Sequence, residues 1–119
     1  MLNVLIPLIS MMYGVSPEFS MRIAKVESNF NPNAYSYTKD GGLFQLNTKY
    51  HKFHNPDWIF DKEINTHRAM NLLSKFKKIC KFNKENYAAL CYNMGKSRVL
   101  SLKNPEKQTY LKKLTLVWR

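Results

Sequence analysis

Four segments of the chain open with the residues that start α-helices. Each begins with Ser, Asp or Asn, whose side chain can accept a hydrogen bond from a free N–H of the first helical turn. Two continue with Pro, which costs no hydrogen bond at the first helical position. The predicted helices cover residues 16–28, 61–80, 83–93 and 104–118. No alternating apolar and polar run is long enough to predict a strand, so the chain is expected to be mainly α-helical.

The chain begins with an uncharged apolar run, MLNVLIPLISMMYGV. This run resembles the hydrophobic region of a signal peptide, but no Lys or Arg precedes it and no small-residue cleavage site follows. It is also too short to span a bilayer. We interpret it as the first helix of the fold. Because 119 residues suit one core and no linker or repeat interrupts them, residues 1–119 are expected to form a single domain.

The balance of charge predicts anionic surroundings. Nineteen Lys and Arg residues against eight Asp and Glu residues give a formal net charge of +11. Such a charge attracts nucleic acid, an anionic membrane face or the polymers of a bacterial wall. The basic residues are spread along the chain, and none of the usual nucleic-acid-binding motifs is present. Nucleic acid is therefore not expected as the primary ligand.

The cysteines and histidines predict neither a disulfide framework nor a metal site. Cys80 and Cys91 lack CxxC spacing and lie beside apolar residues, which favours buried free thiols over a bridge. His51, His54 and His67 have no accompanying cluster of ligands, so we interpret them as surface or loop residues. No cofactor is expected.

Most of the eight carboxylates have a structural explanation. Five lie in or beside the first turn of a predicted helix, where the free N–H groups and the helix dipole stabilise a negative charge. They are Glu18, Asp61, Glu63, Glu85 and Glu106. Asp57, in NPDW, is typical of a turn. Glu27 and Asp40 remain without such an explanation.

Glu27 falls on the apolar stripe of its predicted helix, together with Ile23 and Phe30. Burial disfavours the charged form of a carboxyl group and so raises its pKa. A raised pKa keeps a glutamate protonated near neutral pH, as a general acid requires. The alternative is a solvated glutamate in the last turn of the helix, and periodicity alone does not separate the two interpretations.

Three blocks of sequence resemble, in order, the lytic transglycosylase (SLT) domain and its goose-type lysozyme relatives. ESNFNPNA, which begins at Glu27, resembles E-S-x-F-x-P-x-A, and GLFQ at residues 42–45 resembles G-L-M-Q. LCYNMG at residues 90–95 resembles A-x-Y-N-x-G. FDKEIN resembles a segment that leads to an asparagine, here Asn65, and PEKQTYLKKL resembles a closing E-x-x-x-Y that ends at Tyr110. The likeness covers nearly the whole chain.

The resemblance implies a mainly α, lysozyme-like single domain of about six helices with little or no strand. It implies an enzyme that cleaves the β-1,4 bond between N-acetylmuramic acid and N-acetylglucosamine in peptidoglycan, with Glu27 as general acid. The hydroxyl of Tyr92 would hold the Glu27 carboxyl, although without the resemblance Tyr92 is an ordinary core residue. The implied substrate-binding residues are Ser28, Gly42, Leu43, Phe44, Gln45, Asn93 and Glu106. The Gly-Gly backbone would approach a sugar closely, and the Gln45 amide would donate to it and accept from it.

Some details depart from the family pattern. Phe44 stands where the family usually has methionine, which would reshape a wall of a sugar subsite. GKSRV replaces the usual G-P-G-R-V turn, so the loop after Asn93 is expected to differ in shape.

Asp40 decides between two mechanisms. The family is thought to use one glutamate, while the 6-hydroxyl of the substrate attacks and leaves a 1,6-anhydromuramoyl end. Goose-type lysozymes carry additional aspartates between the glutamate and the G-L-M-Q block, and Asp40 lies in that interval. Asp40 is also typical of a turn in KDGG. We expect the one-carboxylate mechanism, with hydrolysis assisted by Asp40 as the alternative.

Peptidoglycan lies outside the cytoplasm, and the sequence shows no recognisable signal peptide. Together these predict a bacteriophage lysin that is released through a holin or carried on the virion. It would act as a monomer on glycan strands, with an anionic wall or membrane surface as a further partner. The alternative from another class is a non-catalytic module that binds the wall or serves assembly and keeps only the fold.

Overall fold

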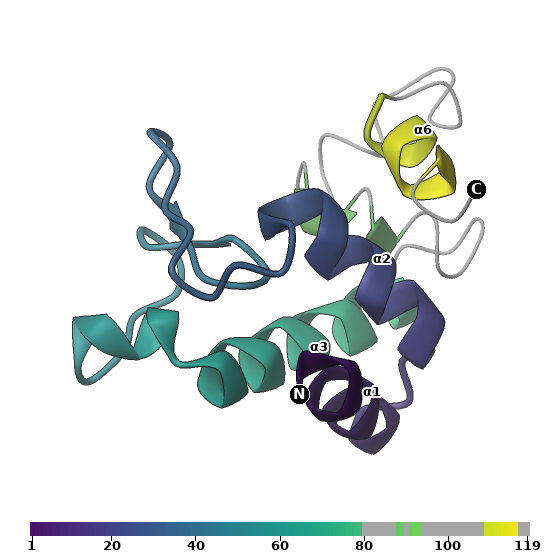
Figure 1. The fold of residues 1–119 in the computed structure, drawn as a ribbon, viewed down its shortest axis with the longest axis horizontal. Helices are drawn as coiled ribbons and strands as arrows, with labels where there is room; N and C mark the ends of the chain where they lie inside the picture. The colour runs from purple at the N-terminus through teal and green to yellow at the C-terminus, as the bar shows by residue number, and fades with distance from the viewer. Residues whose placement is uncertain (80–87, 90, 94–108, 117–119) are drawn as a thin grey trace.

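The computed structural model describes residues 1–79, 88–89, 91–93 and 109–116 (Figure 1). Its named elements are α1 (Leu2–Met12), α2 (Pro17–Ser28), β1 (Asp40–Gly41), β2 (Leu46–Asn47), the 3₁₀-helix η1 (Pro56–Phe60), α3 (Lys62–Ile79) and α6 (Thr109–Leu116). Residues 88–89 and 91–93 are helical as well. The prediction of a mainly α-helical chain with little strand is confirmed.

The helices α2 and α3 begin where the sequence predicts. The Ser16 side chain accepts a hydrogen bond from the Phe19 N–H at 3.3 Å, and Pro17 occupies the first helical position. Asp61 accepts hydrogen bonds from the backbone N–H groups of Glu63 and Ile64, each at 2.9 Å. The helix starts predicted at residues 83 and 104 lie outside the described residues.

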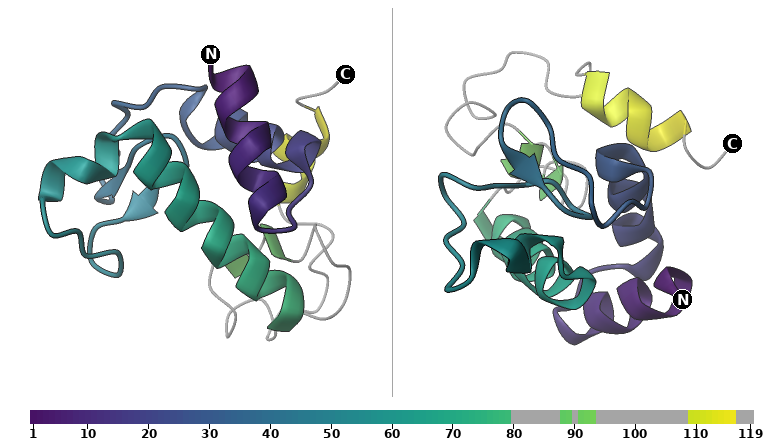
Figure 2. Two further views of the ribbon diagram at one scale, coloured as in Figure 1. Left: turned by 90° about the horizontal axis from the view of Figure 1, so that it is seen from below. Right: turned by 60° about the vertical axis from the view of Figure 1, so that its left-hand side comes forward.

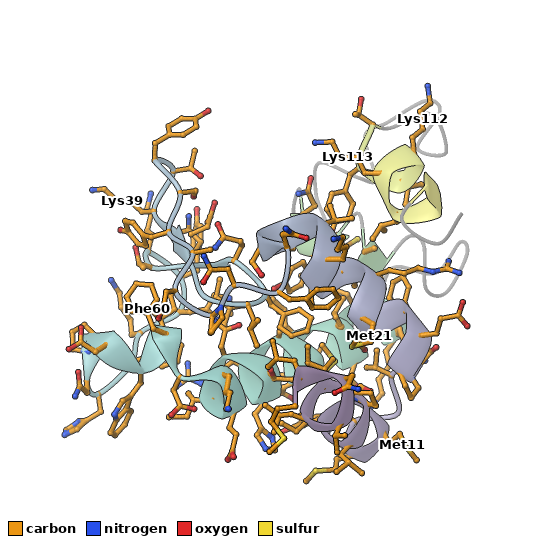
Figure 3. All side chains as sticks on the ribbon, viewed as in Figure 1. Met11, Met21, Lys39, Phe60, Lys112 and Lys113 are labelled. Carbon is orange, nitrogen blue, oxygen red and sulfur yellow. The ribbon has the colours of Figure 1, made fainter. Side chains whose placement is uncertain are left out.

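The apolar run at the start of the chain is the helix α1, as predicted. It packs against both α2 and α3, and Ile6 and Ile9 enter the core (Figure 2). Its other face is apolar too, with Leu8 and Met11 exposed. Figure 3 labels Met11 on this helix. Within the described part of the chain, no helix is both long enough and apolar enough to cross a membrane.

The GLFQ block forms the loop of a small hairpin. β1 pairs antiparallel with β2, with Asp40 opposite Asn47 and Gly41 opposite Leu46, so residues 42–45 connect the two strands. Gly42 has a φ of +82°, and a Cβ at this position would lie 2.1 Å from Nδ2 of Asn65. The glycine is therefore required by the interior of the protein. The approach of the Gly-Gly backbone to a bound sugar stays a prediction.

Asn65 of α3 holds this loop in place through hydrogen bonds of its side chain. Its side chain is fully buried and accepts a hydrogen bond from the Phe44 N–H at 2.9 Å. It also donates to the carbonyl oxygens of Gly41 at 3.1 Å and Ile59 at 2.8 Å. One amide thus joins the hairpin, η1 and α3, and it satisfies buried backbone groups that would otherwise destabilise the fold.

Two smaller expectations are corrected by the structure. Asp57 lies in the 3₁₀-helix η1, which begins after an Asn55 cap. Cys91 is buried and disulfide-bonded, so the expectation of a free thiol is wrong for this residue. Spacing alone did not reveal it, because a disulfide depends on which segments the fold brings together. Cys80 lies outside the described residues.

Candidate active site

A cleft of about 550 Å³ lies between the C-terminal end of α2, residues 36–51, which carry the β1–β2 hairpin (the hairpin segment), α3 and residues 91–93. Glu27, Asp40, Gln45, Tyr92 and Asn93 all line it, so the structure brings five of the predicted site residues together. Its full lining is Glu27, Thr38, Asp40, Gln45, Leu46, Asn47, Tyr50, His51, Leu72, Phe76, Cys91, Tyr92 and Asn93.

The Glu27 carboxyl is partly buried in this cleft, and its pKa is raised from 4.5 to about 7. Burial is the main cause, because it disfavours the charged form. The hydrogen bond from Tyr110 opposes the increase, the negative charge of Asp40 adds to it, and Lys113 opposes it. A glutamate with this pKa is substantially protonated near neutral pH and can donate a proton.

Tyr110 of α6 holds the Glu27 carboxyl in place. Its hydroxyl donates a hydrogen bond of 2.7 Å to Oε2 of Glu27. Figure 3 shows Lys113 on the same helix and Lys39 on the hairpin segment, on either side of the C-terminal end of α2. Glu27 lines the cleft together with residues 38–51 and is hydrogen-bonded to Tyr110 of α6, so its carboxyl lies beside two elements that are far apart in the sequence.

The hydroxyl of Tyr92 donates to the carbonyl oxygen of Phe44. The expected hydrogen bond from Tyr92 to Glu27 is therefore corrected: Tyr110 makes it instead. Burial, together with the nearby Glu27, raises the pKa values of both tyrosines well above their ordinary range, so both remain neutral donors. The sequence signal for Tyr110 was present in the closing E-x-x-x-Y match.

Asp40 is the first residue of β1, directly after the turn formed by residues 36–39. Its carboxylate accepts hydrogen bonds from Oγ1 of Thr38 at 2.7 Å and from Nδ2 of Asn47 at 2.9 Å. These bonds fix a second carboxylate in the wall of the cleft. Thr38 and Asn47 were not predicted as site residues, because their role depends on the pairing of the two strands.

Several predicted substrate contacts lie away from the cleft. The side chains of Leu43 and Phe44 are 0% exposed and belong to the core, so the expected effect of Phe44 on a sugar subsite is corrected. Ser28 donates to the Ala24 carbonyl oxygen at 3.3 Å and does not line the cleft. Glu106 lies outside the described residues.

Gln45 is the one member of the GLFQ block that lines the cleft. Its Nε2 donates to the carbonyl oxygens of Ala34 at 3.2 Å and Gly42 at 3.0 Å. Both of these donations are made within the protein, which leaves the amide oxygen as the group that can face a ligand.

The cleft is also lined by residues that the sequence did not predict, among them Tyr50, His51 and Phe76. Burial, with the positive charge of Arg68, lowers the pKa of His51, which favours its neutral form. Within the described residues, no group of three or more His, Cys, Asp or Glu side chains could hold a metal ion.

Comparison with known proteins agrees with this geometry. A sequence model of the family described as the transglycosylase SLT domain matches residues 5–114. No curated protein matches the chain. The 70 kDa soluble lytic transglycosylase from Escherichia coli is similar in structure, with a TM-score of 0.71 and 22% sequence identity over 95% of this chain and 18% of that chain.

A second structure, a complex of the 70-kDa soluble lytic transglycosylase with bulgecin A, gives a TM-score of 0.72 and 22% identity over the same shares of the two chains. At this identity the likeness establishes the fold. The present chain spans only 18% of the length of these larger proteins. The expectation of a lytic transglycosylase fold is confirmed.

Proposed function

Because the chain belongs to the transglycosylase SLT domain family, we propose that it cleaves the β-1,4 bond between N-acetylmuramic acid and N-acetylglucosamine in peptidoglycan. The observation that carries the proposal is Glu27, a carboxyl group with a pKa of about 7 in a cleft of about 550 Å³. Such a group is matched to proton transfer near neutral pH.

In the proposed reaction Glu27 donates its proton to the glycosidic oxygen, and the bond from that oxygen to C1 of the muramoyl sugar breaks. The acetamido oxygen of the substrate stabilises the positive charge that develops at C1. The 6-hydroxyl of the same sugar then attacks C1 and gives its proton to the Glu27 carboxylate. The product ends in a 1,6-anhydromuramoyl sugar, no water is consumed, and the glutamate is regenerated as the acid.

Tyr110 supports both protonation states of Glu27. Its hydroxyl orients the carboxyl for proton donation and then stabilises the carboxylate that forms. Gln45 and Asn93 would contribute polar contacts to the sugar from the adjoining walls of the cleft.

The position of Asp40 favours a second candidate, hydrolysis of the same bond. Asp40 lines the same cleft as Glu27, and its negative charge contributes to the raised Glu27 pKa. A second carboxylate near the acid can activate a water molecule, as in ordinary glycosidases. However, the carboxylate of Asp40 already accepts hydrogen bonds from Thr38 and Asn47, so both of its oxygens are engaged within the protein.

The product distinguishes these candidates. Purified peptidoglycan would be digested with the wild type, with Glu27→Gln and with Asp40→Asn, and the fragments analysed by mass spectrometry. We expect anhydro ends, about 18 mass units lighter than hydrolysed ends because the tethered hydroxyl replaces water, and no cleavage by Glu27→Gln. Reducing ends that disappear in Asp40→Asn would select hydrolysis.

A folded wild type that binds the wall without cleaving it would instead support the non-catalytic alternative. Action at the bacterial cell wall follows from the proposed substrate. Release by a phage and a monomeric state stay predictions of the sequence.

A further inference from the structure

We infer that Tyr50 forms a stacking platform for a sugar ring of the glycan strand at the rim of the cleft. This inference rests on the proposed function, because it takes the polymer bound in that cleft to be a glycan. Tyr50 lines the same cleft as Glu27, yet 76% of its surface is exposed. A large aromatic side chain at the edge of a cleft offers a flat apolar surface that a ligand can cover.

The backbone that carries Tyr50 is fixed before any ligand binds. The N–H of Tyr50 donates to the Asn47 carbonyl oxygen at 3.2 Å, and the N–H of His51 donates to the same oxygen at 2.9 Å. Asn47 is joined in turn to Asp40 through the 2.9 Å side-chain hydrogen bond. The backbone position of Tyr50 relative to the carboxylates of the cleft is therefore set by these hydrogen bonds, which limits the backbone ordering that binding requires.

Two other aromatic side chains of this region, Tyr35 and Trp58, pack against neighbouring rings. The ring of Tyr35 packs edge-on against Phe60, with 6.1 Å between the ring centroids, and Trp58 lies 6.2 Å from His54. The ring contact found for Tyr50 is with Nζ of Lys49, 5.7 Å from the ring centroid. A flexible lysine can move aside at little cost, so the ring remains available to a ligand.

A pyranose ring fits this surface chemically. One face of an amino sugar presents C–H groups, which pack on an aromatic face, while its hydroxyl and acetamido groups point outward and can reach polar neighbours. Lys49 adds a positive charge beside the platform, and peptidoglycan carries carboxylates on its peptide stems. The same surface would offer less to a flexible, fully charged polymer that has no ring to stack.

The test measures binding separately from cleavage. The Glu27→Gln variant is used because it is not expected to cleave the polymer. The loss of this protein from solution on addition of purified peptidoglycan gives an apparent Kd. Tyr50→Ala should raise this Kd by about three- to tenfold, the range of one aromatic contact. Tyr50→Trp retains a flat ring and should bind within about twofold of the parent protein.

Tyr37 provides the matched control. It is 97% exposed, lies on the same hairpin segment and does not line the cleft, so Tyr37→Ala should leave the Kd unchanged. Equal Kd values for the two alanine variants would overturn the inference, as would a Tyr50→Trp variant as weak as Tyr50→Ala. If Tyr50→Ala does not fold, Tyr50→Leu, which has bulk without a flat ring, replaces it with the same expected loss.

The result also separates this inference from the proposed function. If the wild type cleaves peptidoglycan but the Kd is the same without Tyr50, the stacking inference is wrong and the proposed function stands. If binding depends on Tyr50 but the wild type does not cleave peptidoglycan, the stacking inference stands and the proposed function is wrong.

Discussion

The hydroxyl of Tyr110 and the carboxyl of Glu27 are joined by a 2.7 Å hydrogen bond across 83 positions of sequence. Glu27 lies in the last turn of α2, and Tyr110 lies in the first turn of α6. The hydrogen bond to the candidate acid thus forms only when α6 packs beside α2. This dependence gives α6 a direct influence on the protonation of the site.

Removal of the Tyr110 hydroxyl should change both the rate and its pH dependence. In Tyr110→Phe the hydrogen bond that lowers the Glu27 pKa is lost, so that pKa rises further. The carboxyl also loses its orientation, and the carboxylate formed in the reaction loses a donor. We expect kcat/KM to fall about ten- to a hundredfold, while the alkaline limb of the pH–rate profile moves to higher pH.

Tyr92→Phe is the comparison for this prediction. The Tyr92 hydroxyl donates to the Phe44 carbonyl oxygen, so its removal should lower activity without moving the alkaline limb upward. An equal upward displacement in both variants would show that the Tyr110 hydrogen bond does not set the Glu27 pKa.

Glu27 should also make the stability of the fold depend on pH. Between pH 4.5 and about 7 the unfolded chain loses this proton while the folded chain keeps it, so the free energy of unfolding falls as the pH rises. Glu27→Gln removes the cost of ionising a buried group. Its Tm should exceed that of the wild type at pH 8 by about 10 °C, the change expected for roughly 3 kcal/mol, and should match it at pH 4.

Glu18→Gln is a suitable control on the same helix. Glu18 is exposed and pairs with Arg22 at 2.7 Å, so its replacement should bring no gain in Tm at pH 8. Thermal unfolding followed by circular dichroism at the two pH values measures both variants. A Glu27→Gln variant that gains as much at pH 4 as at pH 8 would contradict the raised pKa.

Much of the fold follows from local signals in the sequence. The side chains of Ser16 and Asp61 cap α2 and α3 as predicted, because an N-cap needs only the residue itself and the two or three that follow it. The apolar stripe of α2 likewise placed Glu27 toward other side chains. Its partner was not predictable by periodicity, since Tyr110 reaches it through the packing of a helix 83 residues away.

The GLFQ block shows that a motif does not predict which of its side chains face a cleft. Its resemblance located the block in the site region, and all four residues were taken as substrate contacts. The structure places the side chains of Leu43 and Phe44 in the core and only that of Gln45 in the cleft. A short motif records which residues recur together, but the direction of each side chain depends on the hairpin register and on Asn65 below it.

A comparison of two glycines distinguishes the strain of a positive φ angle from the steric clash of an added Cβ. Gly14 and Gly42 both have positive φ angles, +70° and +82°, but a Cβ at Gly14 would meet nothing within 4 Å. A Cβ at Gly42 would lie 2.1 Å from Asn65 Nδ2 and 2.3 Å from the Ile59 carbonyl oxygen. Gly14→Ala should therefore cost about 1 kcal/mol of stability, and Gly42→Ala about 3 kcal/mol or more.

Urea denaturation of the two alanine variants measures these costs. Gly42→Ala should also lose peptidoglycan cleavage, because displacement of Asn65 would release the loop that positions Gln45. Equal losses of stability in the two variants would mean that the hairpin moves away from Asn65 without difficulty.

The charges around Glu27 should displace its pKa in opposite directions. Asp40 raises that pKa and Lys113 lowers it, so Asp40→Asn should move the alkaline limb of the pH–rate profile to lower pH, and Lys113→Gln should move it to higher pH. Lys113 is exposed, so its effect should shrink as the salt concentration rises. Asp40 is partly buried and held by Thr38 and Asn47, so its effect should persist. Displacements of the same sign in both variants would contradict the opposite effects assigned to these two charges.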